Sequence, residues 1–173
     1  ELLARLQRTG KIAADSRVYF VDDGSRDRTW PIIADFVRQR LPVVGIRLSR
    51  NRGHQNALLA GLFLAKGDAV VSIDADLQDD LEAVEEMLDC YHRGCDIVYG
   101  VRKRRQADSL FKRLSAESFY RLLSAFGAQT IFNHADYRLM SQRAVDALRD
   151  FREVNLYLRG IVPLIKMTDR TLN

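Results

Sequence analysis

A short apolar run that ends in acidic residues constrains the fold of this chain more than any other feature. Residues 69–73 (AVVSI) have the length and the β-branched content of a buried strand. Asp74 and Asp76 follow at once, and Gln78 and Asp79 come next. Because ligands of open α/β sheets bind outside the carboxyl ends of the strands, we expect these side chains to hold a cation or a polar ligand.

Oxygen ligands at this spacing predict a divalent cation. Asp74 and Asp76 are two residues apart, so their side chains share one face of an extended backbone. Mg²⁺ and Mn²⁺ prefer such ligands, and magnesium typically takes one or two carboxylates while substrate phosphates and water fill its other positions. The alternative is a plain helix cap, which we expect of Asp79 alone, with Glu82 completing a capping box.

The remaining chain alternates between predicted strands and predicted helices. The strands are expected at 17–21, 43–48, 69–73 and 96–100, and the helices at 1–8, 29–40, 53–66 and 81–93. Such alternation is typical of an α/β fold with a mostly parallel sheet. The 173 residues, of which 47% are apolar and 29% charged, fit one soluble domain with a sizeable core.

Composition narrows the class of protein further. No apolar stretch reaches the roughly 18 residues that a membrane span requires. The net charge of +4 and the pI near 9.3 favour anionic partners such as phosphates or a lipid surface. Cys90 and Cys95 lie in or beside predicted regular structure, which favours buried thiols over a disulfide or a metal site.

Two more polar loops follow predicted strands and are expected at the same edge of the sheet. In VDDGSRDRT, Asp22 and Asp23 could accept hydrogen bonds from a base N–H or from ribose hydroxyls, or they could only form a turn. In LSRNRGHQ, the backbone N–H groups and Arg50 or Arg52 could meet phosphate. His54 is interpreted as a hydrogen-bonding residue at a helix start, because no second histidine lies at ligand spacing.

Blocks of sequence along nearly the whole chain carry a family resemblance. They are VDDGSRDRTW, LSRNRGHQNALLAGL, GDAVVSIDADLQDD, DIVYGVR, FKRL, FYRLL, ADYRLMSQRAVDAL and LRGIV. In this order and spacing, the chain resembles the inverting family 2 glycosyltransferases that load a sugar onto a polyprenyl phosphate. That group includes dolichol-phosphate mannose synthases and bacterial undecaprenyl-phosphate glycosyltransferases. Each block is weak alone, whereas the ordered set is highly specific.

The resemblance implies a GT-A fold, which is a Rossmann-like α/β/α sandwich, and a nucleotide site within it. Asp22 and Asp23 match the loop that receives the nucleotide. We expect Arg50 and Asn51 of the second polar loop to bind the nucleotide as well, together with Asp74.

For the reaction, the resemblance implies a metal site and a group of catalytic residues. Asp74 and Asp76 match the family's DxD motif, and Gln78 matches an amide that joins Asp76 on Mg²⁺ or Mn²⁺. Asp136 and Arg138 match a D-F/Y-R segment near the reacting centre. The candidate catalytic residues are therefore Asp76, Asp136 and Arg138, with Asp136 expected to orient more than to deprotonate.

Two departures from the family pattern affect this interpretation. The family begins with a strand and a P-V-Y-N-E-like segment that supplies nucleotide contacts and a central strand of the sheet, and nothing here matches it. Leu156 stands where relatives usually have a basic residue, so one phosphate contact has no counterpart. We therefore interpret residues 1–173 as a single catalytic domain, a portion of a longer membrane-associated protein.

The segment 102–126 predicts contact with a lipid surface. A basic run is followed by apolar residues at helical spacing, which Lys112, Arg113 and Arg121 flank. By resemblance, Arg102 matches a basic residue that follows the preceding strand in the family. Arg102, Lys112, Arg113 and Arg121 are all expected near the acceptor phosphate. The alternative is a core-packed helix beside a solvated basic loop. Nucleic acid is not expected as a partner, because the net charge is modest and no binding motif is present.

The expected function is a metal-dependent, inverting transfer of a sugar from a nucleotide-diphosphate sugar to undecaprenyl or dolichyl phosphate. The expected place is the cytoplasmic face of a membrane, most simply the bacterial inner membrane. The alternative is a non-catalytic nucleotide- or lipid-binding module derived from a truncated transferase. A phosphoacceptor receiver domain would need a late Lys-Pro pair, and a nucleotidyltransferase a Gly-rich phosphate loop after the first strand; the sequence has neither.

Overall fold

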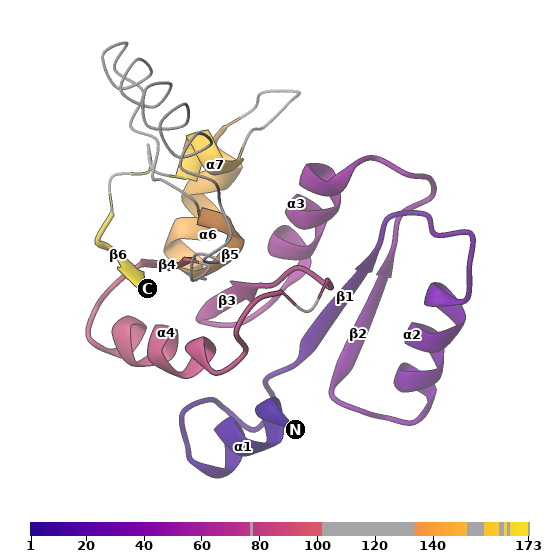
Figure 1. The fold of residues 1–173 in the computed structure, drawn as a ribbon, viewed down its shortest axis with the longest axis horizontal. Coiled ribbons are helices and arrows are strands. Elements are labelled where there is room, and N and C mark those ends of the chain that lie inside the picture. The colour runs from indigo at the N-terminus through magenta and orange to yellow at the C-terminus, as the bar shows by residue number, and fades with distance from the viewer. Residues whose placement is uncertain (77, 102–133, 152–157, 163–164, 166, 173) are drawn as a thin grey trace, which may run out of the picture.

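The computed structural model describes residues 1–76, 78–101, 134–151, 158–162, 165 and 167–172 (Figure 1). The helices are α1 Leu2–Arg8, α2 Thr29–Arg38, α3 His54–Leu64, α4 Ala83–His92, α6 Gln142–Arg149 and α7 Leu158–Ile161. The strands are β1 Val18–Asp22, β2 Val43–Arg47, β3 Ala69–Ser72, β4 Ile97–Val101, β5 His134–Ser141 and β6 Asp169–Leu172. The eight elements predicted within residues 1–101 are confirmed, with bounds that shift by at most two residues, while the helical segment predicted within 102–126 lies outside the described residues. By contrast, β5, α6, α7 and β6 have no counterpart among the predicted elements.

The strands form two sheets in the described part of the chain. β1 and β2 pair in parallel, with Val18 opposite Val43 and Asp22 opposite Arg47. The second sheet has the order β3-β5-β4-β6, in which β4 and β6 are parallel and β5 is antiparallel to both of its neighbours. Because β3, β4 and β6 share one direction, the mostly parallel α/β fold is confirmed. Among the described residues β1 and β3 do not pair, so the expected single sheet is present as two.

Successive residues of β1 face different helices. The Phe20 ring lies 6.3 Å from the ring of Phe36 on α2. Val21 packs instead against Gly61 of α3, where an added Cβ would lie 3.0 Å from Val21 Cγ2. Since α3 also contacts β3, this helix packs against strands of both sheets (Figure 1).

Alternation along β5 divides its side chains between two helical layers. Asp136, Arg138 and Met140 lie on one face of the strand, and Tyr137 and Leu139 lie on the other. Met140 belongs to a buried cluster with side chains of α3, α6 and α7, whereas Leu139 and Tyr137 belong to a cluster with side chains of α4. Helices therefore cover both faces of the four-stranded sheet, as in an α/β/α sandwich.

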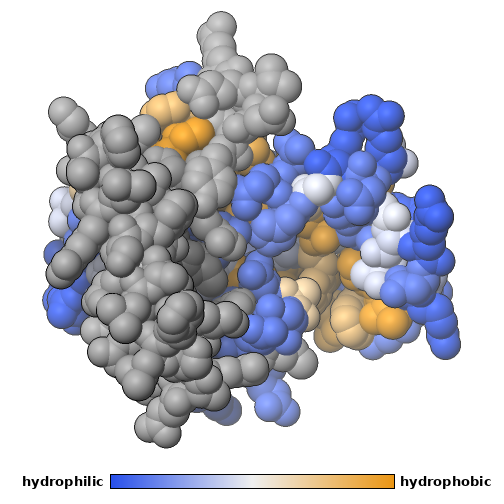
Figure 2. All heavy atoms as spheres, turned by 45° about the horizontal axis from the view of Figure 1, so that its top comes forward, coloured by the Kyte–Doolittle hydropathy of each residue, from blue (hydrophilic) through white to orange (hydrophobic). Residues whose placement is uncertain are grey.

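The surface of the described residues is mainly polar on the face that Figure 2 shows, with smaller apolar areas between the polar side chains. The most exposed large apolar side chains include Ile32, Leu41 and Leu64. Apolar side chains scattered in this way are normal for a folded protein. Among the described residues, no helix has both the length and the apolar character needed to cross a bilayer.

The start of α4 differs from the predicted capping box. Glu82 occupies the N-cap position, and no side-chain hydrogen bond is made at this cap. Asp79 is buried, and its Oδ2 accepts a hydrogen bond from Asp74 N–H at 3.4 Å, while Asp80 Oδ1 accepts one from Glu82 N–H at 3.0 Å. The prediction that Asp79 caps α4 is therefore wrong, because Asp79 turns back toward the end of β3.

Candidate functional site

A buried ion pair on β5 lies at the centre of the candidate site. Asp136 and Arg138 are each 1% exposed, and Arg138 Nη2 donates a hydrogen bond to Asp136 Oδ1. Ser72 of β3 donates from Oγ to the main-chain oxygen of Asp136, which fixes the strand at this point. Such partners are needed because an unpaired charge taken out of water carries a penalty of several kcal/mol. The side chain of Asp136 is therefore held as an ordered carboxylate.

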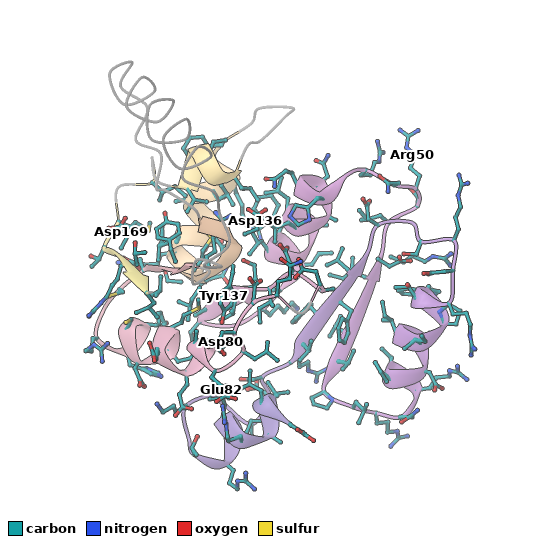
Figure 3. All side chains as sticks on the ribbon, viewed as in Figure 1. Arg50, Asp80, Glu82, Asp136, Tyr137 and Asp169 are labelled. Atoms are coloured by element: carbon teal, nitrogen blue, oxygen red, sulfur yellow. The ribbon has the colours of Figure 1, made fainter. Side chains whose placement is uncertain are left out.

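Two residues from the first turn of α3 also reach this carboxylate. His54 Nε2 lies 2.9 Å from Asp136 Oδ2, and Gln55 Nε2 donates to the same oxygen at 3.3 Å. Figure 3 shows Asp136 lying toward the start of α3, while Arg50 points outward from the loop after β2. The N-terminal end of a helix favours nearby negative charge. Asp136 is thus contacted by donors from both α3 and β5.

Asp74, directly after β3, approaches the same histidine. Its Oδ1 lies 3.8 Å from His54 Nε2, which is within ion-pair distance but too long for a hydrogen bond. Burial raises the pKa of the Asp74 carboxyl, and a positively charged His54 opposes that rise. Three more aspartates raise this pKa further: Asp136, Asp79 and Asp76. The carboxyl therefore lies in a region of excess negative charge, which a cation would offset.

The loop after β3 carries the other predicted metal ligands. Asp76 and Gln78 are exposed, and Gln78 N–H donates to Asp76 Oδ1 at 3.0 Å. Across the described ranges, no group of three or more His, Cys, Asp or Glu side chains is placed to hold a metal ion. Mg²⁺ and Mn²⁺ need fewer, because one or two carboxylates suffice when phosphate and water supply the rest. The two carboxylates of Asp74 and Asp76 and the amide of Gln78 fit such an ion, and this metal site stays a prediction.

Asp22 is a buried acid at the carboxyl end of β1. Its Oδ1 accepts a hydrogen bond from Ser25 N–H at 3.0 Å. Its Oδ2 is buried and accepts no hydrogen bond from the part of the chain that the structure describes, and Arg47 Nε lies 3.7 Å away from it. Since buried polar atoms are nearly always hydrogen-bonded, this oxygen has capacity for a donor on a ligand.

Asp23 ties the loop after β1 to the loop before α3. Its Oδ1 accepts from Arg52 N–H at 2.7 Å, and its Oδ2 accepts from Gly53 N–H at 2.9 Å. These bonds fix the two residues that precede His54, and so they fix the start of α3. The two roles expected of Asp23, a turn former or a nucleotide contact, do not include these hydrogen bonds. The sequence does not reveal them because 29 residues separate Asp23 from Arg52.

The same two loops approach each other at backbone distance and border a cleft. Gly24 has φ +76°, and an added Cβ would lie 2.7 Å from the backbone nitrogen of Asn51, so only glycine fits here. The cleft has a volume of about 520 Å³. It is lined by Gly24, Ser25, Arg26, Arg47, Leu48, Ser49, Arg50 and Asn51. Three arginine side chains around one cleft favour an anionic ligand such as a diphosphate.

The structure brings several predicted residues of the described ranges into two groups. Asp136 pairs with Arg138 and shares His54 with Asp74, whereas Arg50 and Asn51 line the cleft. The first residues of α3 link them, because Asp23 holds Gly53 while Asp136 contacts His54. Four predicted residues lie outside the described residues: Arg102, Lys112, Arg113 and Arg121.

Sequence reasoning did not assign a role in this site to four side chains. His54 and Gln55 contact Asp136, and Arg26 and Arg47 line the cleft. The only signal for them was their place at the ends of predicted strands or in the polar loops that follow. That signal does not reveal a partner more than 80 residues away, as Asp136 is from both residues of α3.

Known proteins similar to this chain identify its family. The family model described as Glycosyl transferase family 2 matches residues 1–149. The uncharacterized glycosyltransferase YkoT of Bacillus subtilis (strain 168) is 53% identical over 156 residues, which cover 89% of this chain and 46% of that protein. The bactoprenol glucosyl transferase of Shigella phage SfV is 38% identical over 146 residues, which cover 84% of this chain and 48% of that protein. The chain therefore spans about half the length of these curated relatives.

A solved structure shows the same fold. The crystal structure of S. aureus TarS 1–349 matches with a TM-score of 0.57 and 18% identity, covering 96% of this chain and 52% of that one. At this identity the likeness concerns the fold alone, and it confirms the expected GT-A fold. The family model covers most of the chain, and the curated relatives exceed 30% identity over most of it. The chain belongs to glycosyl transferase family 2.

Proposed function

We propose that this chain is the catalytic part of an enzyme that transfers a sugar from a nucleoside diphosphate sugar to a polyprenyl phosphate, with inversion at the anomeric carbon. One observation carries the proposal: the start of α3 links the ordered carboxylate of Asp136, which contacts His54, to the loops of the arginine-lined cleft, where Asp23 holds Gly53. The name of the bactoprenol glucosyl transferase supports the class of acceptor. Family membership supports the class of reaction.

The donor is proposed to bind in the cleft at the carboxyl ends of β1 and β2. Arg26, Arg47 and Arg50 line this cleft and supply positive charge for a diphosphate. Asp22 Oδ2, buried and without a hydrogen bond from the described residues, would accept one from a base N–H or a ribose hydroxyl. Asp23 would contribute by holding the loop that carries Asn51, rather than by contact with the donor alone.

The leaving diphosphate is proposed to lie beside the loop after β3. Asp74, Asp76 and Gln78 would hold Mg²⁺ or Mn²⁺, which when bound supplies positive charge where negative charge develops in the transition state. Asp74 and Asp76 already carry like charges close together, and burial of Asp74 makes its negative charge unfavourable. The loop is therefore poised to gain stability when its negative charge is neutralised.

The acceptor phosphate is proposed to act as the nucleophile without a strong base. A phosphate monoester with its second pKa near ~6 is largely ionised at neutral pH. Asp136 would orient rather than deprotonate, since Arg138, His54 and Gln55 already hold its two oxygens. The acceptor is further proposed to meet Arg102, Lys112, Arg113 and Arg121 at the cytoplasmic face of a membrane.

A transfer assay tests this proposal. The full chain would be incubated with a panel of nucleoside diphosphate sugars, Mg²⁺ or Mn²⁺, and undecaprenyl phosphate in detergent. We expect a glycosyl phosphoryl polyprenol whose anomeric configuration, measured by NMR, is opposite to that of the donor. Nucleotide binding without transfer for any donor would favour the non-catalytic module. Retention of configuration would contradict the inverting mechanism.

Asp22→Asn is expected to weaken nucleotide binding by about 10- to 100-fold, the range for a hydrogen bond to a charged group. Asparagine can keep the bond from Ser25 N–H to one side-chain oxygen, but it puts an NH₂ group in place of Oδ2. Isothermal titration calorimetry with the nucleoside diphosphate measures the effect. Asp35→Asn on the exposed face of α2 is the matched control, because Asp35 pairs locally with Arg38 and Gln39. Equal affinity in the wild type and in Asp22→Asn would leave Asp22 as a turn former.

A further inference from the structure

We propose that His54 is a positioning residue for sugar transfer: it sets the orientation of the Asp136 carboxylate relative to Asp74, which follows the neighbouring strand β3. This inference rests on the proposed function. It assigns to His54 a role in the reaction that its interpretation as a helix-start residue does not contain.

The hydrogen bonds at the start of α3 separate these two roles. The N-cap residue of α3 is Gly53, and no side chain makes a hydrogen bond at that cap. The ring of His54 contacts Asp136, a residue of β5, across 82 positions of sequence. His54 therefore contributes to the site through its ring, rather than to its own helix through a cap.

The exposure of the two partners indicates what the bond does. The side chain of His54 is 55% exposed, whereas that of Asp136 is 1% exposed. An exposed ring loses little packing energy when it is replaced. The buried carboxylate, by contrast, is oriented by every donor that reaches it, so loss of the ring acts mainly on Asp136.

In the described part of the chain, donors from two elements reach Asp136 and constrain its rotation. Arg138 holds Oδ1 from the same strand, and His54 holds Oδ2 from α3. Gln55 reaches Oδ2 at the longer distance of 3.3 Å, and its Oε1 accepts from Leu158 N–H at the start of α7. His54 thus makes the shorter of the two contacts from α3 and fixes the second oxygen.

The same ring atom also faces the loop after β3. His54 Nε2 lies 2.9 Å from Asp136 Oδ2 and 3.8 Å from Asp74 Oδ1, so it stands between carboxylates that follow or belong to different strands. Like-charged groups repel each other, and a donor close to both of them offsets part of that repulsion. His54 therefore lies close to both Asp136, on the proposed acceptor side of the site, and Asp74, on the proposed donor side.

Kinetics of three variants of the full chain test the inference. His54→Leu removes the donor, His54→Gln keeps an N–H near the position of Nε2, and Asn56→Leu is the matched control. Asn56 lies in the same helical turn, but its side chain donates only to Arg52 O in the described structure, at 2.8 Å. Melting temperatures of all three variants show whether the fold is retained.

We expect His54→Leu to lower kcat by about 10- to 100-fold while the KM for the donor changes less than twofold. His54→Gln should recover most of the lost kcat, and Asn56→Leu should match the wild type. If kcat in His54→Leu stays within twofold of the wild type, or if His54→Gln is as slow as His54→Leu, the inference is overturned. A wild type that transfers no sugar overturns the proposed function instead.

A spectroscopic measurement tests the contact without reference to activity. To donate to the ionised Asp136, His54 must carry its hydrogen on Nε2 when neutral. A ¹⁵N spectrum of the wild-type full chain, with the His54 signals assigned by their loss in His54→Gln, should show the Nε2–H tautomer. The Nδ1–H tautomer would overturn the inference, because Nε2 would then have no hydrogen to donate.

Discussion

Asp136→Asn is expected to abolish detectable sugar transfer and to lower the free energy of unfolding by about 3–5 kcal/mol. The stability effect follows from the buried ion pair, since the substitution removes a carboxylate from a guanidinium that is 1% exposed. The activity effect follows from the loss of the charge that is proposed to orient the reacting groups. Chemical denaturation measures the first effect, and the transfer assay measures the second.

A second substitution separates these two effects. Arg138→Met combined with Asp136→Asn removes both charges of the pair. We expect the double variant to recover most of the lost stability, because replacing a buried ion pair by neutral side chains of similar size is often nearly neutral. Transfer should remain absent in the double variant. If the double variant regains activity together with stability, Asp136 has only a structural role.

Asp76→Asn is expected to lower kcat/KM by at least about 100-fold without a change in melting temperature. Asp76 is exposed, and an asparagine at this position can still accept the hydrogen bond from Gln78 N–H, so the loop should keep its conformation. The substitution removes negative charge, which is the property that a divalent cation recognises. A bound metal ion typically supplies several kcal/mol of transition-state stabilisation.

Asp80→Asn is the matched control for Asp76. Asp80 is an exposed acid in the same loop, and its Oδ1 accepts a local hydrogen bond from Glu82 N–H. Its replacement should leave kcat/KM within about twofold of the wild type, since exposed substitutions away from a site have small effects. The wild type should lose activity in EDTA and regain it with Mg²⁺ or Mn²⁺. Near-normal activity of Asp76→Asn in EDTA would remove the proposed metal role.

The sequence predicted the elements of residues 1–101 because each has its own local signal. The strand at 69–73 is a short β-branched run, and the helix at 29–40 has apolar residues at helical spacing. β5 lacks the signal that marks the strand at 69–73, because residues 134–141 contain no β-branched residue and Asp136 and Arg138 prevent a continuous apolar run. Those charges are tolerated in a buried strand because they pair with each other and because His54 and Gln55 of α3 also contact Asp136, and the sequence pattern does not reveal these contacts.

The sequence predicted those residues of the candidate site that lie at the carboxyl ends of strands. Asp22 and Asp74 come directly after strands, so their place at one edge of the fold could be expected. The roles of Asp23 and His54 could not, since their partners are 29 and 82 residues away in the sequence. The capping prediction for Asp79 was wrong for a related reason, because its local pattern competes with a hydrogen bond to Asp74 N–H.

The division of the strands into two sheets has a consequence for local unfolding. In the described part of the chain, Asp22 is the only residue of β1 or β2 that is fully buried, whereas β4 and β5 supply many buried residues. The β1–β2 unit is attached to the second sheet mainly through side chains of α3, rather than through a backbone ladder. Segments with few buried contacts open at lower free energy than the core and often carry ligand-binding loops. The arginine-lined cleft thus lies in the part of the described structure that should unfold locally at the lower free energy. A ligand bound in the cleft would raise that free energy.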